Sequence, residues 1–198
     1  MNAWRDAPVL IGRHVRLRPL EAADRDALAA AAAGLTDLFY ANVSGLADPD
    51  RFMASALKER DYGRAMPFAV ETPDHAIVGL TRFMRMSEAH RRVEIGGTFY
   101  APAVQRSGVN TEAKLLLLGH AFDVLGCNVV QIRTDWFNRA SQRAIERLGA
   151  KRDGVLRSHQ VMDGRVRDIV VYSIIAGEWP GVRQNLQHLL ARHEGAGR

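Results

Sequence analysis

The sequence predicts one domain of mixed α/β class. Residues 91–122 read as an apolar strand, a short polar loop and a long helix that is apolar around most of its circumference. Residues 129–149 repeat the order of strand, turn and helix. Residues 155–175 hold two β-branched runs on either side of Asp163-Gly164, the strongest short hairpin signal in the chain. Strands therefore alternate with helices in the middle of the chain and form a hairpin near its end.

The elements before residue 91 follow the same mixed order. Alternation of apolar and polar residues from His14 onward predicts a first strand, and acidic residues early in an alanine-rich stretch predict a helix after it. The expected elements are a strand over residues 9–20, a helix over 21–33, a helix over 50–62, and strands over 67–71 and 77–86 joined by a turn at 72–75.

The composition fits a globular domain and argues against several other classes. The chain has 198 residues, of which 47% are hydrophobic and 25% charged, so it can build a sizeable core. Residues 1–12 lack the apolar run of a signal peptide, and no stretch reaches membrane-spanning length. We therefore expect a cytoplasmic protein without a membrane partner. The single cysteine, Cys127, excludes an intramolecular disulfide, and its apolar surroundings predict a buried side chain.

The formal net charge of +5 favours a partner that carries negative charge. Nucleic acid is the weaker candidate, because the basic residues are dispersed and are not interleaved with aromatic residues. A polyanionic cofactor is the stronger one. The seven histidines are scattered without the spacing of metal ligands, so no metal site is predicted.

The loop at residues 105–111 is the strongest candidate for a binding site. It leads into the N-terminus of the helix that follows, where unpaired backbone N–H groups and the positive end of the helix dipole favour phosphate. Gly108 would let the backbone turn sharply and approach an anion. The alternative is a plain turn between a strand and a helix, and these properties alone do not separate the two.

The residues of this loop add a family resemblance. Gln105, Gly108 and Asn110 stand at the marked positions of Q/R-x-x-G-x-G/A, and Thr111-Glu112-Ala113 matches a frequent continuation. The segment resembles motif A of the GNAT superfamily of acyl-CoA N-acyltransferases, in the branch related to RimJ and RimL. Asn110 departs from the usual Gly or Ala, although its backbone can still donate. The resemblance implies that acetyl-CoA binds here as a co-substrate.

A second resemblance lies in residues 138–150. Asn138, Ser141 and Gly149 match motif B of the same superfamily, N-x-x-S-x-x-x-Y-x-x-x-G-F. Ile145 replaces the Tyr that protonates the departing thiolate in many members, and Ala150 replaces Phe. The residues themselves predict that Asn138 caps a helix and that Gly149 ends it. The resemblance implies contacts with acetyl-CoA by Phe99, Tyr100, Gln105, Arg106, Ser107, Gly108, Val109, Asn110, Thr111, Asn138 and Ser141.

With the closing hairpin, the resemblance extends over residues 9–180, which we expect to form the GNAT domain. It implies a mixed, mostly antiparallel and splayed sheet flanked by helices. It also implies a strand bulge near residues 99–101, whose backbone N–H faces the thioester carbonyl. Residues 181–198 would add a C-terminal tail, with an amphipathic helix over 178–193 that covers the core.

The implied reaction is acetyl transfer to a primary amine by direct attack in a ternary complex. Glu94 is the first candidate for the base, and the alternative is a strand glutamate paired with Arg91 or Arg92. Asp168 is the second candidate, and its alternative is a pairing with Arg165 or Arg167. Ser141 is the candidate acid beside the sulfur, because Ile145 has no proton to give.

Two other functions stay open at this stage. The replacement at Ile145 allows a catalytically silent acyl-CoA binder, and the basic charge allows a ribosome- or RNA-associated module. The acceptor could be a small molecule or a protein N-terminus. Its walls are expected from residues 35–62 and from the strand at 83–86, and the alternative for the aromatic and methionine side chains there, including Phe83, is core packing. A homodimer is compatible with the sequence.

Overall fold

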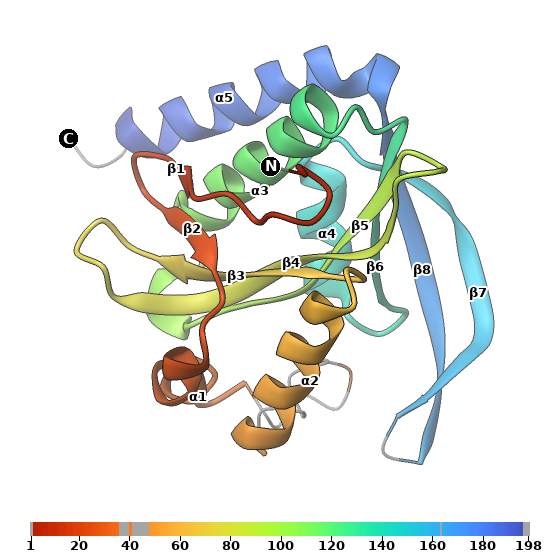
Figure 1. Ribbon diagram of the computed structural model, residues 1–198. Helices are drawn as coiled ribbons and strands as arrows, with labels where there is room; N and C mark the ends of the chain where they lie inside the picture. The colour runs from red at the N-terminus through yellow and green to blue at the C-terminus, as the bar shows by residue number, and fades with distance from the viewer. Residues whose placement is uncertain (1, 36–39, 41–47, 163, 196–198) are drawn as a thin grey trace.

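A computed structural model describes residues 2–35, 40, 48–162 and 164–195 (Figure 1). In this part of the chain eight strands form one sheet, in the order β1-β2-β3-β4-β5-β6-β8-β7. Only the β5–β6 pair is parallel, and the other neighbouring strands are antiparallel. The predicted mixed, mostly antiparallel sheet is therefore confirmed.

Most of the expected elements form within a few residues of their predicted bounds. The strands are β1 (Leu10–Ile11), β2 (Arg16–Pro19), β3 (Met66–Glu71), β4 (Ile77–Ser87), β5 (Arg92–Tyr100), β6 (Val129–Asp135), β7 (Lys151–Met162) and β8 (Arg165–Ile175). The helices are α1 (Arg25–Ala31), α2 (Pro49–Asp61), α3 (Val109–Gly119), α4 (Arg139–Arg147) and α5 (Trp179–Gly195). A π-helical turn, His120–Val124, continues α3.

The prediction of one strand over residues 9–20 is wrong. The chain reverses after β1, where the Gly12 N–H donates to the Val15 carbonyl at 2.8 Å, and Leu10 then pairs with Leu17 in β2. The backbone N–H groups of Arg13, His14 and Val15 at this reversal all donate to the carboxylate of Glu112, at 2.9, 2.6 and 2.9 Å. Glu112 comes from α3, so the sequence around the turn contains no sign of it.

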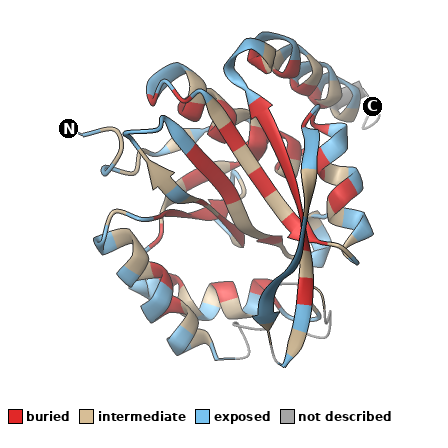
Figure 2. Ribbon diagram, turned by 90° about the vertical axis from the view of Figure 1, so that its right-hand side faces the viewer, coloured by how far each residue is buried: buried red, intermediate tan, exposed pale blue. Residues whose placement is uncertain are grey.

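Two hydrophobic clusters lie on opposite faces of the sheet. The larger one joins the strands to α3, α4 and α5, with Phe83, Ile95 and Leu117 fully buried. The smaller one packs α1 and α2 against the other face, around Leu28 and Leu80. Figure 1 shows α3 and α5 on one side of the sheet and α1 and α2 on the other. Figure 2 shows the buried residues concentrated on the sheet and on the helix sides that face it.

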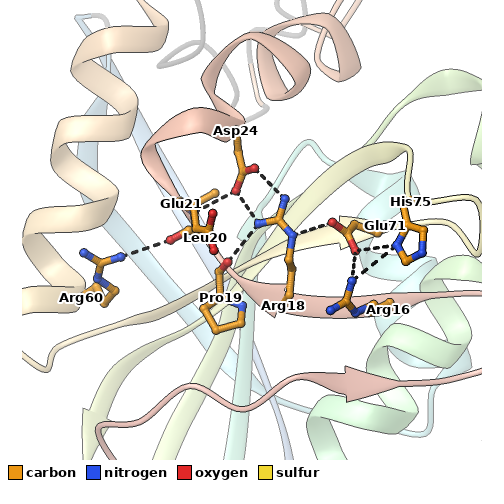
Figure 3. Close-up of polar contacts among 9 residues, drawn as sticks. All are labelled: Arg16, Arg18, Pro19, Leu20, Glu21, Asp24, Arg60, Glu71 and His75. Carbon is orange, nitrogen blue, oxygen red and sulfur yellow. Dashed lines mark hydrogen bonds and ion pairs between the residues drawn. The ribbon is translucent and has the colours of Figure 1, made fainter.

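A polar network ties α1 to the sheet (Figure 3). Arg18 in β2 binds Asp24, just before α1, at 2.6 Å and Glu71 in β3 at 2.5 Å. Both carboxylates are buried, so the charges are neutralised where water is largely excluded. Arg60 of α2 donates to the Leu20 carbonyl at 3.2 Å. These contacts hold α1 and α2 on the face of the sheet that also carries Glu94.

Strands β5 and β6 separate partway along their length. Their ladder covers four pairs and ends at Ile95 with Ile132. Beyond that point β5 stays paired with β4 as far as Tyr100, and β6 stays paired with β8 as far as Asp135. Each strand is therefore held by its outer neighbour while the inner sides part. The predicted splay is confirmed, and it leaves backbone groups of β5 without a ladder partner on this side.

A bulge in β5 lies beside the point of separation. Leu80 pairs with Phe99 and Arg82 pairs with Gly96, so β5 has one residue more than β4 between these pairs. Gly97 has a φ of 57°, and a Cβ there would lie 2.3 Å from Arg82 Nε, so this backbone conformation and the present position of Arg82 favour glycine. The bulge predicted at residues 99–101 is therefore found earlier in the strand. The Ala101 N–H already donates to the Val78 carbonyl at 2.7 Å.

The C-terminal helix packs onto the larger cluster. Trp179 stacks on Phe122 at a centroid distance of 5.5 Å and donates its indole N–H to Asp123 at 3.0 Å. The predicted covering role of this helix is confirmed, while the domain boundary at residue 181 stays a prediction. Cys127 is 2% exposed, and burial raises the pKa of its thiol to about 11. Within the described residues, the helices are too short or too polar to cross a membrane.

Candidate active site

The loop before α3 is shaped by its own side chains. Ser107 Oγ donates to the Val104 carbonyl at 2.6 Å and accepts from the Val109 N–H at 3.3 Å. Gln105 Nε2 donates to the Tyr100 carbonyl at 3.1 Å. These contacts fold the loop so that the first turn of α3 begins directly after Gly108. The N–H groups of Asn110 and Thr111 lie in this turn, ahead of the regular intrahelical bonds.

Gly108 does not use the conformational freedom that the sequence analysis predicted for it. Its φ of −67° is open to any residue, and the left-handed residue of the loop is Arg106, with a φ of 61°. A Cβ on Gly108 would lie 3.2 Å from the Cδ2 atom of His14. Glycine is therefore favoured by the close approach of the His14 ring, which Glu112 holds in place through the backbone N–H of His14.

The first turn of α3 has the properties of an anion site. Its free N–H groups coincide with the positive end of the helix dipole. Arg147 of α4 donates to Thr111 Oγ1 at 3.1 Å, which brings a guanidinium beside the same turn. The geometry of residues 105–111 is therefore compatible with the phosphate site predicted from the sequence.

A buried lysine lies behind the bulge. Lys114 is 5% exposed, and its Nζ lies 3.0 Å from Thr98 Oγ1 and 3.4 Å from Thr81 Oγ1. Burial lowers the pKa of Lys114 from 10.5 to about 7. The amine is therefore largely neutral above neutral pH and supports β4 and β5 through hydroxyl contacts. A single lysine in a long apolar helix does not indicate burial of its amine, so the sequence did not predict this role for Lys114.

Replacing Lys114 with Met is expected to stabilise the protein, most strongly at pH 7 and below. The folded pKa lies below the unfolded one, so between the two values the unfolded chain binds a proton that the folded chain lacks. Wild-type stability therefore rises with pH in this window. The advantage of the variant should shrink by more than about 1 kcal/mol from pH 7 to pH 9.5. Denaturant unfolding of both proteins measures it, and a constant difference would contradict the assignment.

The other side of the gap is formed by the end of β6 and the start of α4. Asn138 caps α4, because its Oδ1 accepts the Ser141 N–H at 3.0 Å, so the predicted cap is confirmed. Gln142 Nε2 donates to the carbonyls of Asp135 and Trp136 at 3.2 and 2.7 Å. Ile145 is 5% exposed and belongs to the larger hydrophobic cluster. It contributes packing at the position where motif B usually has Tyr.

Asp135 is a charged anchor that the sequence did not reveal. Its carboxylate is 2% exposed and contacts Arg165 at 2.6 Å and Arg167 at 2.7 Å. Burial acts to raise its pKa, but hydrogen bonds from Arg167, the Phe137 N–H and Arg165 hold the pKa below its usual value. The residue ends β6, where an aspartate before a turn is common, so its pairing could not be inferred.

Asp168 makes a contact that the sequence did not indicate, and its role as a base stays a prediction. Its Oδ1 accepts the backbone N–H of Ser158 at 2.7 Å, at an irregularity of the β7–β8 ladder. Ser158 has a φ of 49°, so the carboxylate supports a strained turn of the edge strand. The suggested pairing with Arg165 or Arg167 is wrong, since both guanidiniums contact Asp135.

Glu94 is buried on the face that carries α1 and α2. Its Oε2 lies 3.0 Å from Arg85 Nε and 3.1 Å from Arg133 Nε, rather than beside Arg91 or Arg92 as considered from the sequence. These are ion pairs by proximity: within the described residues, Oε2 accepts no hydrogen bond of good geometry. Burial raises the pKa of Glu94, against the opposing effect of Arg133, Arg85, Arg82 and His159.

A cavity of about 140 Å³ opens at this carboxylate. Its lining consists of Arg85, Arg92, Val93, Glu94, Gln131 and Arg133. Phe83, considered for an acceptor wall, is fully buried in the larger cluster instead. Much of the other proposed wall, residues 36–39 and 41–47, lies outside the described residues, as does Asp163 of the hairpin turn.

The three predicted catalytic residues are not in direct contact. Glu94 lies on β5, Ser141 on α4 and Asp168 on β8, and in the described part of the chain no hydrogen bond or ion pair joins any two of them. The part of the chain that the structure describes contains no group of three His, Cys, Asp or Glu side chains placed to hold a metal.

Comparison with known proteins identifies the family. The model of the acetyltransferase (GNAT) domain matches residues 14–151, which is more than half of the chain. The chain belongs to the GNAT acetyltransferase family. The resemblance of residues 105–113 and 138–150 to motifs A and B is thereby confirmed as a family relationship.

Relatives of this GNAT chain include two proteins of Bacillus subtilis. "Uncharacterized N-acetyltransferase YoaA" is 29% identical over 113 residues, which are 57% of this chain and 63% of that protein. "Putative ribosomal N-acetyltransferase YdaF" is 30% identical over 108 residues, which are 54% of this chain and 58% of that protein. The matched segment thus spans about three fifths of each relative.

A solved structure extends the likeness to almost the whole chain. It is a GCN5-related N-acetyltransferase from Brucella melitensis, 30% identical, with a TM-score of 0.83 over 93% of this chain and 86% of that one. The GNAT fold is therefore shared over almost the whole of this chain.

Proposed function

We propose that this GNAT chain is an acetyl-CoA-dependent N-acetyltransferase acting on a primary amine. The observation that carries the proposal is the gap between β5 and β6, which lies next to the free N–H groups of α3. The first turn of α3, at one end of this gap, suits a phosphate. The β5 backbone beyond its last pair with β6 lies at the other end. Family membership and the relative YdaF support a place in the RimJ/RimL-like branch.

The residues on both sides of the gap suit acetyl-CoA as co-substrate. We assign its pyrophosphate to the loop 105–111 and its thioester end to Phe99, Tyr100, Asn138 and Ser141. Tyr100 supports this fit, because its hydroxyl is buried without a hydrogen-bond partner among the described residues. Burial without a partner raises the pKa of Tyr100 and leaves a polar atom that a ligand amide could satisfy.

The reaction then needs a base, an oxyanion site and a leaving group. Glu94 takes the proton of the amine, directly or through water, and the amine nitrogen attacks the acetyl carbon. Backbone N–H groups of β5 beyond the last pair of its ladder with β6 stabilise the negative carbonyl oxygen. The C–S bond breaks and its electron pair stays on sulfur.

The departing sulfur has little help from α4. Ile145 is buried and has no acidic proton, so Ser141, one turn earlier on the same helix face, is the nearest hydroxyl by helical spacing. A thiol pKa near 8.5 makes the thiolate a tolerable leaving group without assistance. The replacement of Tyr by Ile145 also favours a second candidate function, a catalytically silent acyl-CoA binder. Binding of acetyl-CoA without release of free CoA would identify such a protein.

Replacing Asn110 with Pro tests the phosphate site. Proline is tolerated in the first turn of a helix but removes the backbone N–H, whereas Asn110→Ala keeps it. A hydrogen bond to a charged group contributes about 1.5–3 kcal/mol, so the proline variant should bind CoA at least about tenfold more weakly than the alanine variant. Calorimetry with matched melting curves measures this. Equal CoA affinity of two folded variants would place the pyrophosphate elsewhere.

A further inference from the structure

On the face that carries α1 and α2, three strands bring together a group that we call the arginine cluster: Arg82, Arg85 and Arg133 around Glu94. Arg85 and Arg133 contact the Glu94 carboxylate at 3.0 and 3.1 Å. The side chain of Arg82 makes no hydrogen bond or ion pair with any residue that the structure describes, and its Nε is closed to solvent. The cluster therefore holds three guanidiniums and one carboxylate.

Arg82 lies at the point where β5 leaves β6. Its partner across the strands is Gly96, and its guanidinium lies against Gly97, where an added Cβ would be 2.3 Å from Nε and 2.8 Å from Nη2. The bulge and its glycine thus provide the space that the guanidinium fills. Arg82 as a whole is only half-buried, so the remaining N–H groups stay within reach of a ligand.

Burial of the Arg82 guanidinium is unfavourable for folding when no ligand is bound. Burial lowers the pKa of Arg82, and the carboxylates of Glu59 and Glu94 oppose that effect only through their charge. Arginine nevertheless keeps its proton at any ordinary pH, so the cost is not relieved by neutralisation. A guanidinium that is withdrawn from water without an acceptor gains most from a charged oxygen group, which it can bind through two parallel hydrogen bonds.

We propose that Arg82 binds an anionic oxygen group of the acceptor, so that the preferred substrate is an amine that also carries a carboxylate or a phosphonate-like group. This assignment rests on the proposed acetyl transfer, since it names the substrate class of the same site. The amine would lie toward Glu94 and the anion toward Arg82. A polyamine would place a second positive charge against three guanidiniums, which is unfavourable in a half-buried site.

The test compares amines of similar length that differ in the anion. The acceptors are 4-aminobutyrate, 3-aminopropylphosphonate and n-butylamine, with acetyl-CoA, and the measured quantity is release of free CoA. For the wild type we expect kcat/KM for at least one acidic amine to exceed that for n-butylamine by at least about tenfold, the effect of one charged hydrogen bond. Whichever acidic amine is preferred identifies the carboxylate or the phosphonate class.

The variant Arg82→Leu should remove this preference, measured as the ratio of kcat/KM for the acidic amine to kcat/KM for n-butylamine. The loss should appear mainly in KM, and Arg82→Lys should restore part of it because the charge remains. Arg192→Leu, on the exposed side of α5, is the matched control for the lost charge and should retain the preference. Since the Arg82 side chain makes no hydrogen bond or ion pair with the described residues, its replacement should not lower the melting temperature.

Three outcomes would overturn the proposal. One is a wild type that acetylates n-butylamine as well as both acidic amines. Another is an Arg82→Leu variant that loses the same factor with every acceptor. The third concerns binding without turnover: if the CoA-loaded protein binds 4-aminobutyrate and 3-aminopropylphosphonate no better than CoA-loaded Arg82→Leu by calorimetry, Arg82 is not the anion site. Failure of acetyl transfer with retained Arg82-dependent binding would instead reject the proposed function alone.

Discussion

Replacing Glu94 with Gln is expected to lower kcat by about a hundredfold or more, the usual contribution of a general base. Glutamine keeps the shape of the side chain but cannot accept the proton of the amine. Affinity for acetyl-CoA should be unchanged, because Glu94 lies on the face that carries α1 and α2, whereas the loop 105–111 leads into α3 on the opposite face of the sheet. Steady-state kinetics with calorimetry separates the two effects.

The pH dependence sharpens this test. Burial raises the pKa of Glu94, so the wild-type rate should fall on acidification as the carboxylate takes up a proton at a higher pH than an exposed glutamate would. The variant should lack this acidic limb. Glu88→Gln, an exposed change in the turn between β4 and β5, is the control and should behave as wild type. Equal turnover of the wild type and Glu94→Gln from pH 6 to 9 would remove Glu94 from the mechanism.

Replacing Glu112 with Ala is expected to cost about 3 kcal/mol of folding free energy or more. Its buried carboxylate accepts three backbone N–H groups, from Arg13, His14 and Val15, and each would lose a partner. For a chain of this length that loss corresponds to a fall of about 6–12 °C in melting temperature. Calorimetric or optical melting measures it directly.

The same substitution should weaken CoA binding. Glu112 holds the turn at residues 12–15, and this turn places the His14 ring against Gly108 in the loop before α3. Glu112→Gln should lose less stability, since it keeps one acceptor oxygen, while Glu88→Ala should change stability by less than about 0.5 kcal/mol. A melting temperature of Glu112→Ala equal to that of the wild type would show that the N-terminal turn is not held by this carboxylate.

Much of the fold follows from local patterns in the sequence. The turn signal at residues 163–164, the cap at Asn138 and the stop at Gly149, whose φ is 102°, depend on residues close to one another in the chain. The motif residues of the loop and of α4 identified the family for a similar reason, because their spacing is fixed within one strand–loop–helix unit.

The first strand shows where local patterns fail. Alternation in residues 9–20 predicts one continuous strand, yet the chain reverses within this range. At the reversal three consecutive backbone N–H groups donate to Glu112, which lies 97–99 residues later in the sequence. The bulge of β5 is another case. It depends on the register against β4 and on the room that Arg82 requires over Gly97, and neither is visible in the β5 sequence.

The sequence by itself determined most of the order of strands and helices and the family, and it predicted the loop 105–111 as an anion site, because each depends on neighbours along the chain. Only the tertiary structure decided which charges meet. The order of β4, β5 and β6 places Arg82, Arg85 and Arg133 around Glu94. The pairing of β6 with β8 brings Arg165 and Arg167 to Asp135 instead of Asp168. Such pairings arise from strand register and from burial, which concentrate distant side chains where water cannot screen them.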